Sequence, residues 1–486
     1  MMKTQMEAAV NSLPSEVLET IFAHCTCRDL LQSIQNVCSR WREVAQSTRL
    51  WKDVTYCPEY KARSEEVVKM LKISPNLQNI TLEDSFDDTV LQAITENCAE
   101  LRKLEILTLP DLDLNFLKTL QEKCPKVQYL SIPHSVLTDF DKCEVVGKFT
   151  NLKVLNLTGD PDTNTSLILK PVADHCKKLE HLEFWTDRFE MNDLRHLLCM
   201  RKDTLHTLGV CCCNESGECV LPALSICELK SLSLFNYSDC WRHYEKIEYF
   251  GKLKTVRALS ITDFNSEDES DDLKEIFENE NMAQLAELKL ILSTYFDDYV
   301  TEVLIKNCPL LKDLSLISCY RMTDASFKMI TNFKELNSLT MSDTSFVTET
   351  GILHLQSVKY LKCLKISICK VGLRNIVKLS KLRHLSLEWQ DLAEFPWDLV
   401  PHHMQNLQCL QIYHCRNVDT CALEKLKTVL PSLKVKVKVS LYEYCTYEFC
   451  LWHFHHEALC HMQGSQFNFD PSMTCGCQKV NYVDDD

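Results

Sequence analysis

Glycine is scarce in this chain, at only 9 of 486 residues. Nucleotide-binding loops need several closely spaced glycines, because the backbone must approach phosphate groups directly. No such loop occurs, and neither does the metallohydrolase motif HExxH or the serine-hydrolase motif GxSxG. We therefore expect no catalytic residues in this chain and no bound cofactor.

Positive charge is in the minority, with 53 Lys and Arg against 68 Asp and Glu, for a net charge of −15. Nucleic acids and anionic membranes bind mainly to basic surfaces, so neither is expected as a partner. No segment approaches the roughly 18 apolar residues of a membrane helix. The opening MMKTQMEAAVNS lacks the apolar core of a signal peptide. We expect a cytoplasmic or nuclear protein whose 27 cysteines stay reduced.

Leucine, by contrast, is abundant and regularly spaced. The pattern L-x-x-L-x-L, with Ile, Val, Phe or Met as substitutes, recurs at a mean period of about 25 residues, within the range typical of leucine-rich repeats. The alternation predicts a short strand whose leucines face a core and whose other side chains face outward. A helical segment such as VTEVLIKNC then returns the chain to the next strand. The fifteen copies begin at Leu77, Leu101, Val127, Leu152, Leu179, Leu205, Leu229, Val256, Leu285, Leu311, Leu336, Leu361, Leu382, Leu407 and Leu433.

No single copy can bury its apolar face alone, so the copies must stack on one another. The sequence therefore predicts an α/β solenoid over residues 56–440, a curved array of about 15 repeats with a parallel sheet inside and helices outside. The last copy, LKVKVKVS, alternates lysine with valine. Lysines along a terminal strand discourage pairing with another sheet edge, so we interpret this copy as the end of the array.

The repeat also accounts for many of the cysteines. They recur three residues before a copy and eight residues after its start, where the repeat needs small buried groups. We interpret them as core residues rather than reactive thiols, including the last member of the CCC run at 211–213. The cysteines at these two positions are Cys98, Cys124, Cys176 and Cys308, then Cys213, Cys319, Cys369 and Cys415.

Outward strand positions lie two, four and six residues after each start, and most carry small or polar side chains. Six of them carry large apolar side chains, which are unexpected on an exposed strand and are typical anchors of protein interfaces. We predict that they contact a protein partner, with Trp185 and Phe235 as the best candidates. The alternative is that the C-terminal tail or a loop covers them. The six are Tyr129, Trp185, Phe235, Ile291, Ile317 and Tyr413.

The tail, residues 441–486, departs from the repeat and gathers cysteine and histidine. These residue types bind zinc or iron–sulfur clusters, but their spacing matches no standard finger. We expect that the tail holds no metal and packs against the last repeats or lies across the outward strand positions. The candidate ligands are Cys450, His453, His456, Cys460, His461, Cys475 and Cys477.

The first 55 residues follow a different pattern, with three short helices and large apolar side chains at helical spacing. Such a small unit cannot bury all of these side chains internally, and the remaining apolar surface indicates a partner. The stretch LPSEVLETIF…DLLQSIQNVCSRWREVAQSTRLWKDV resembles an F-box, at residues 11–55. The elements LP-x-E-x-L-x-x-IF, DLL, VC-x-x-W and LW-x-x-V come in that family's order, although Cys25 replaces a larger aliphatic residue.

With the repeats, the chain up to about residue 440 resembles F-box and leucine-rich-repeat proteins. The resemblance implies a non-catalytic substrate-recognition subunit of an SCF-type ubiquitin ligase. Its F-box would dock on a Skp adaptor, and through it on a cullin scaffold and a RING subunit, while the repeats hold a protein substrate for ubiquitination and proteasomal degradation. The Skp-facing residues implied are Leu13, Pro14, Val17, Leu18, Ile21, Phe22, Leu30, Leu31, Val37 and Trp41.

Two alternatives remain open from the residues alone. The chain could be a leucine-rich-repeat binding protein without a ligase role, whose first helices only cap the solenoid. It could also be a metal or redox sensor that acts through its tail.

Overall fold

A computed structural model shows two compact units, residues 1–205 and 206–486. The structure describes residues 13–25, 27–47, 49–52, 54–58, 62–83, 86–108, 112–137, 139–158, 164–235, 244–262, 271–278, 280–291, 296–344, 346–367 and 373–438.

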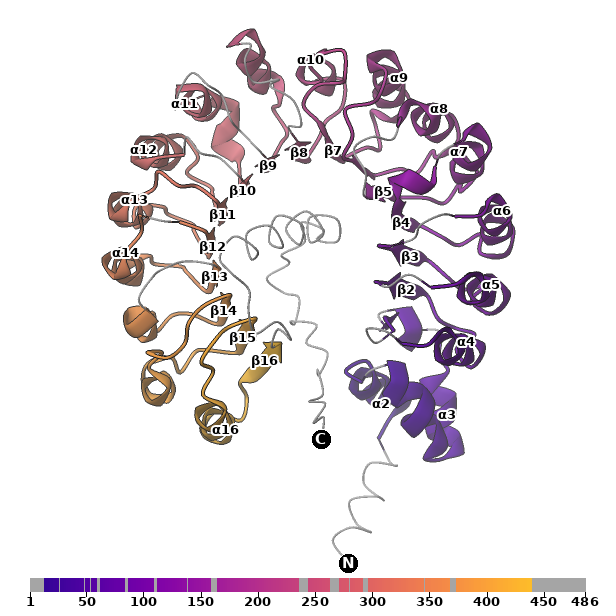
Figure 1. Cartoon of the computed structure of the whole chain (residues 1–486), viewed down its shortest axis with the longest axis horizontal. Helices are drawn as coiled ribbons and strands as arrows, with labels where there is room; N and C mark the ends of the chain where they lie inside the picture. The colour runs from indigo at the N-terminus through magenta and orange to yellow at the C-terminus, as the bar shows by residue number, and fades with distance from the viewer. Residues whose placement is uncertain are drawn as a thin grey trace, which may run out of the picture. The chain divides into compact units, whose positions relative to one another are not determined.

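The first unit opens with short helices and continues as alternating strands and helices. Its strands pair in parallel, each with the next in sequence, and the helices lie on one side of the sheet (Figure 1). The opening helices are α2 (Ser15–Phe22), the π-helix η1 (Asp29–Ser33), the 3-10 helix η2 (Ile34–Asn36), α3 (Ser39–Ala45) and the 3-10 helix η3 (Leu50–Lys52). The strands are β1 (Thr55–Tyr56), β2 (Asn79–Leu82), β3 (Lys103–Ile106), β4 (Tyr129–Pro133), β5 (Val154–Thr158) and β6 (His181–Phe184). The later helices are α4 (Ser64–Lys72), α5 (Asp88–Asn97), α6 (Leu114–Lys123), η4 (His134–Val136), α7 (Phe140–Gly147), α8 (Ser166–His175) and α9 (Met191–Arg201).

The second unit repeats the same arrangement, again with parallel strands in sequence order and helices on one side (Figure 1). Its strands are β7 (Thr207–Cys211), β8 (Ser231–Phe235), β9 (Ala258–Thr262), β10 (Glu287–Ile291), β11 (Asp313–Ile317), β12 (Ser338–Ser342), β13 (Cys363–Ser367), β14 (His384–Glu388), β15 (Cys409–Tyr413) and β16 (Lys434–Lys438). Its helices are α10 (Leu221–Leu224), η6 (Tyr244–Lys252), α11 (Asp271–Glu278), η7 (Glu280–Gln284), α12 (Asp298–Asn307), α13 (Asp324–Ile330), α14 (Glu349–His354), η8 (Leu355–Ser357), η9 (Leu373–Lys378), η10 (Trp397–Leu399), α15 (Val400–His403) and α16 (Thr420–Val429).

Each strand is held in register by its neighbour. The carbonyl oxygen of Gln78, just before β2, accepts from the backbone N–H of Arg102 and of Lys103, at 2.8 and 2.9 Å. The same double acceptance recurs at Ala286, whose carbonyl bonds Lys312 and Asp313. Because this bond and the strand ladder both link one repeat to the next, the leucines of neighbouring strands stack in columns under the helices.

The α/β solenoid architecture predicted from the leucine spacing is confirmed. A strand stands two residues after the start of every copy except the last, and α12 coincides with the segment VTEVLIKNC. The structure adds one strand that the pattern missed, β1, which pairs with β2 at Thr55 and Asn79. The pattern missed β1 because its two residues, Thr55 and Tyr56, include no leucine.

The frame of the last copy is corrected by the structure. The sequence pattern starts the last copy at Leu433. In the observed register Val435 pairs with Leu410 and Val437 with Ile412, both of which face the core. The strand of the last copy therefore begins one residue after Leu433, whereas the other strands begin two residues after the start of their copies, and its lysines take the outward positions.

The cysteines of the repeat are core residues, as predicted. Cys98, Cys124, Cys176 and Cys308 are all fully buried, and burial raises the pKa of the Cys308 thiol to about 12. Cys213, Cys319 and Cys415 are also buried. Thiols in such surroundings stay protonated and unreactive. Cys369 lies outside the described residues.

The candidate metal ligands of the tail, from Cys450 to Cys477, lie outside the described residues. Within the part of the chain that the structure describes, no group of three or more His, Cys, Asp or Glu side chains is placed to hold a metal ion. No helix in that part is long and apolar enough to cross a membrane.

Carboxylates link the helix starts of successive repeats in the second unit. Asp297 caps its own helix α12 by accepting from the N–H of Val300 at 2.9 Å. The next residue, Asp298, instead accepts from the following repeat, from the N–H and hydroxyl groups of both Thr323 and Ser326. Burial by itself raises the pKa of Asp298, but these hydrogen bonds outweigh it and lower the pKa overall.

We expect Asp298→Ala to destabilise the folded chain by about 1–2 kcal/mol at pH 7, since it removes charge-assisted hydrogen bonds at a partly exposed site. A lowered folded-state pKa means that this stabilisation is present above the unfolded value of about 4 and is lost as the pH falls through the folded value. Urea unfolding measures the free energy of unfolding of both proteins at pH 7 and at a series of pH values below 4. The difference between the wild type and Asp298→Ala should narrow as the pH falls.

The matched control is Glu302→Ala, which removes an exposed carboxylate from the same helix. A difference in the free energy of unfolding between wild type and Asp298→Ala that stays constant across the whole pH range would contradict a stabilising role of the ionised Asp298 carboxylate.

Candidate partner-binding surfaces

Helix α2 carries two apolar faces. Its first turn is closed by the carbonyl oxygen of Pro14, which accepts from the N–H of Val17 and of Leu18 at 3.1 Å. Leu18 and Phe22, four residues apart, are 0% and 2% exposed. Val17 and Ile21 are also four residues apart, and they are 41% and 44% exposed. Residues at this spacing share a side of a helix, so one apolar face is packed and the other is not.

The packed face of α2 forms the core of the N-terminal domain. The Phe22 ring meets the Trp41 ring edge-on, with the ring centroids 5.1 Å apart. Leu30 and Leu31, from η1, are also buried. Four of the predicted Skp-facing residues thus close the core of the free chain. Their contact with an adaptor stays a prediction.

Of the remaining predicted residues, four are exposed, whereas Leu13 and Trp41 are half-buried. Val37, in the turn before α3, is 54% exposed, and Pro14 is exposed as well. A hydrogen bond from the Arg40 guanidinium to the Leu13 carbonyl oxygen joins the start of α2 to α3. We call the six residues at or near this surface the N-terminal apolar face: Leu13, Pro14, Val17, Ile21, Val37 and Trp41.

Another part of the N-terminal domain packs on the first repeat. Asn76 donates to the carbonyl oxygen of Gln46 at 2.6 Å, and Asn79 donates to that of Val54 at 3.2 Å. Trp51 is 1% exposed, and its indole N–H donates to the Ala45 carbonyl oxygen at 2.8 Å. The domain therefore caps the start of the repeats while its N-terminal apolar face remains at the surface.

The outward apolar residues of the strands are less accessible than the sequence suggested. Tyr129 and Trp185 lie in the first unit, and the other four in the second. Five of the six are buried, and only Tyr413 is half-buried. They were predicted as exposed anchors because their alternation places them outward, yet alternation does not show what covers a side chain. Their contact with a partner stays a prediction.

A row of unusual backbone conformations follows the strands of the second unit, and the sequence analysis missed it. Ser318, Asp343, Trp389 and His414 each stand seven residues after the start of a copy, with φ between 51° and 54°. Non-glycine residues rarely adopt this left-handed conformation, least of all a bulky one. The Trp389 and His414 rings are stacked, with centroids 4.6 Å apart. In the sequence, serine or aspartate at this position is only a weak indication of a left-handed backbone conformation.

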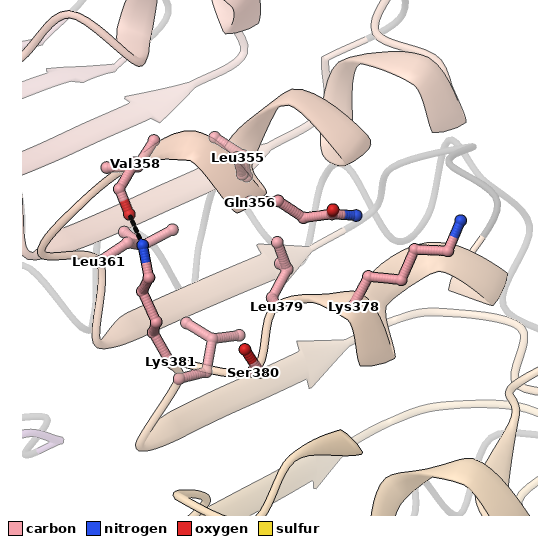
Figure 2. A pocket seen from close by; sticks show the side chains of 9 residues that line it. Leu355, Gln356, Val358, Leu361, Lys378, Leu379, Ser380 and Lys381 are labelled. Carbon is pink, nitrogen blue, oxygen red and sulfur yellow. Dashed lines mark hydrogen bonds between the residues drawn. The ribbon is translucent and has the colours of Figure 1, made fainter.

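A shallow pocket in the second unit lies between two turns that precede strands (Figure 2). Its lining holds no carboxylate, thiol or imidazole, and its charged groups are the ammonium groups of Lys378 and Lys381. The Lys381 ammonium points to the carbonyl oxygen of Val358 at 3.5 Å (Figure 2). The lining residues are Leu355, Gln356, Val358, Leu361, Lys378, Leu379, Ser380, Lys381 and Leu382.

Residues 10–57, which span these short helices, match the family model described as F-box-like. The chain joins an F-box-like domain to leucine-rich repeats. An F-box/LRR-repeat protein of Arabidopsis thaliana is 23% identical over 199 residues, which cover 38% of this chain and 80% of that protein.

Two solved structures are similar at low identity. The Rad7 and Elc1 complex of yeast contains a chain with a TM-score of 0.48 and 17% identity, covering 89% of this chain and 94% of that chain. A leucine-rich-repeat protein of Leptospira interrogans has a TM-score of 0.36 and 16% identity, covering 76% and 91%. Both TM-scores are below 0.5, so the solenoid assignment depends on the strand pairing itself.

The two faces of α2 predict opposite responses to truncation. Leu18→Ala should destabilise the F-box-like domain by about 2–4 kcal/mol, because it opens a cavity in a closed core. Ile21→Ala, at a surface position, should change stability by less than about 0.5 kcal/mol. Hydrogen exchange of backbone amides in α2 and α3, followed by mass spectrometry, measures both effects. Faster exchange in the Ile21 variant than in the Leu18 variant would reverse the assignment of the faces.

Proposed function

We propose that this chain is a substrate-receptor subunit of an SCF-type ubiquitin ligase. Its F-box-like domain docks on a Skp-type adaptor, which brings the cullin scaffold and the RING subunit, and its repeats bind a protein substrate. The observation that carries the proposal is the exposure of Val17, Ile21 and Val37 on a domain that already has a closed core. Water-exposed apolar side chains clustered on a small domain indicate a protein partner.

The exposed side chains of this face supply part of the free energy that docking needs. Burying a side chain of this size contributes about 1.5–3 kcal/mol when it starts fully exposed, and these three start about half exposed. Together they supply roughly 2–4 kcal/mol, a substantial part of the roughly 8 kcal/mol of a micromolar complex. Leu13, Pro14 and Trp41 add area at the same face.

In this role the chain works without chemistry of its own. A tether raises the effective concentration of a substrate lysine near the ubiquitin thioester, which another subunit carries. What the chain must supply is a fixed distance between the adaptor surface and the substrate surface. The hydrogen bonds that join Asn76 and Asn79 to the F-box-like domain hold that domain against the first repeat.

The competing function is a repeat-based binding protein in which the first helices only cap the solenoid. The same contacts at Asn76 and Asn79 favour a cap. A cap does not account for the exposure of Val17, Ile21 and Val37, which face away from the buried core. The two functions therefore differ in one property, adaptor binding through these residues.

The decisive experiment is co-expression of the full chain with a Skp-type adaptor, followed by size exclusion and a titration. The double variant Val17→Glu with Ile21→Glu should weaken the complex at least about tenfold, because docking would bury two unpaired carboxylates. The matched control is Val429→Glu, which places the same charge at a 60% exposed valine of α16 in the second unit. That variant should bind as the wild type does.

Failure of the intact, folded chain to bind the adaptor would refute the receptor function and favour the cap. Undiminished binding by the double variant would show that another surface docks the adaptor.

A further inference from the structure

A row of polar side chains crosses the outward face of the sheet in the first unit. The row occupies the same register position on five successive strands, β2 to β6, so its members are cross-strand neighbours. Neighbouring strands lie about 4.8 Å apart, which brings each side chain within reach of the next. The members are Thr81, Glu105, Ser131, Asn156 and Glu183.

The Glu105 carboxylate anchors one end of this row. It is 6% exposed and accepts from the Thr81 hydroxyl at 3.1 Å. It also receives the Lys103 ammonium at 3.0 Å and the Tyr129 hydroxyl at 3.5 Å. Its charge is compensated by Lys103, so it needs no further partner.

The directions of the next hydrogen bonds follow from this arrangement. An ionised carboxylate only accepts, so the Tyr129 hydroxyl must donate to Glu105. Burial, and then the nearby carboxylates of Glu105 and Glu183, raise the pKa of Tyr129, which keeps that hydroxyl protonated. The hydroxyl oxygen accepts from the Asn156 amide nitrogen at 3.1 Å. The amide oxygen of Asn156 is therefore turned away from Tyr129.

That amide oxygen is buried and has no hydrogen-bond partner within the described residues, on a side chain that is 5% exposed. The hydroxyl of Ser131, on the neighbouring strand, is 0% exposed and likewise lacks a partner there. Buried polar atoms without partners are costly and uncommon. Two of them side by side on the outward face point to a ligand.

On the other side of Asn156 lies the carboxylate of Glu183. The Trp185 indole N–H donates to one of its oxygens at 3.1 Å and orients the group. The His181 ring nitrogen is 3.5 Å from the other oxygen. Each carboxylate oxygen accepts more than one hydrogen bond, so Glu183 retains capacity for a donor. We call Ser131, Asn156 and Glu183 the acceptor row.

We propose that the acceptor row binds a basic side chain, lysine or arginine, of a polypeptide that lies across the outward face of the first unit. This inference rests on the proposed function only in taking that polypeptide to be the ligase substrate. An ammonium or guanidinium group carries several donors and no acceptor, which complements a carboxylate, an amide oxygen and a hydroxyl.

Other ligand classes fit the acceptor row less well. An anion would meet the carboxylate of Glu183 and the amide oxygen of Asn156. A metal ion would need a third His, Cys, Asp or Glu side chain, and the described residues place no such group here. The same face already binds a cation in the chain itself, since the Lys103 ammonium lies 4.5 Å from the centre of the Tyr129 ring.

The test is selection of a phage-displayed random dodecapeptide library on the immobilised full chain. Enriched peptides should share one position occupied by lysine or arginine, and the ratio of the two shows which head group the row prefers. In a synthetic copy of an enriched peptide, replacing that residue by methionine should weaken binding to the wild-type chain at least about tenfold, the scale of a lost charge-assisted contact.

The variant Glu183→Gln keeps the shape of the side chain and removes its charge. It should weaken the basic peptide at least about fivefold and leave the methionine peptide unchanged, which a merely structural role would not do. The matched control is Glu180→Gln, because Glu180 lies just before the same strand with its carboxylate paired to Lys153 at 2.6 Å. That variant should bind both peptides as the wild type does.

The proposal is overturned if no peptide is enriched, if the shared position is apolar or acidic, or if Glu183→Gln binds the basic peptide as tightly as the wild type. Adaptor binding, measured on the same preparations, separates this outcome from the proposed function. A chain that selects basic peptides without binding an adaptor refutes only the ligase role, and one that binds the adaptor without selecting them refutes only the acceptor row.

Discussion

The strand of one repeat satisfies its backbone hydrogen bonds only by pairing with the strand of the next repeat. The rest of the structure follows from that constraint. The carbonyl oxygen that precedes a strand is commonly bonded by two N–H groups of the next repeat, as at Gln78 and Ala286. The leucine columns are likewise shared between neighbours. Stacking therefore fixes the register, and the register fixes which side chains stand next to one another on the outward face. The five-strand polar row of the first unit exists only because that register is kept from β2 to β6.

The positions of the strands were predictable because their signal is local. Alternation of apolar and polar residues identifies a half-buried strand directly. The leucine motif repeats this alternation fifteen times. The prediction failed only where that signal is weak. Strand β1 includes no leucine, and the lysine–valine alternation of the last copy fits either of two frames. Pairing of Val435 with Leu410 resolves the frame, and that contact is not local in sequence.

The candidate sites were less predictable, because their properties depend on what covers each residue. The F-box pattern contains both faces of α2 at the same helical spacing, and spacing alone does not separate buried Leu18 from exposed Ile21. Alternation predicts Tyr129 and Trp185 to face outward, but it does not predict that both are buried. The acceptor row could not be predicted at all. The free oxygen of Asn156 follows from a chain of hydrogen-bond directions that starts at Glu105.

The central claim is that the exposed face of the F-box-like domain is the adaptor surface, and residue-specific photocrosslinking tests it most directly. Benzoylphenylalanine placed at Ile21 or Val37 of the full chain should crosslink to a Skp-type adaptor on irradiation, and the same group at Val429 should not. All three sites are exposed apolar positions, so the probe itself does not disturb a buried core. Crosslinks to the adaptor from Val429, or none from Ile21 and Val37 in a complex that forms, would contradict the account.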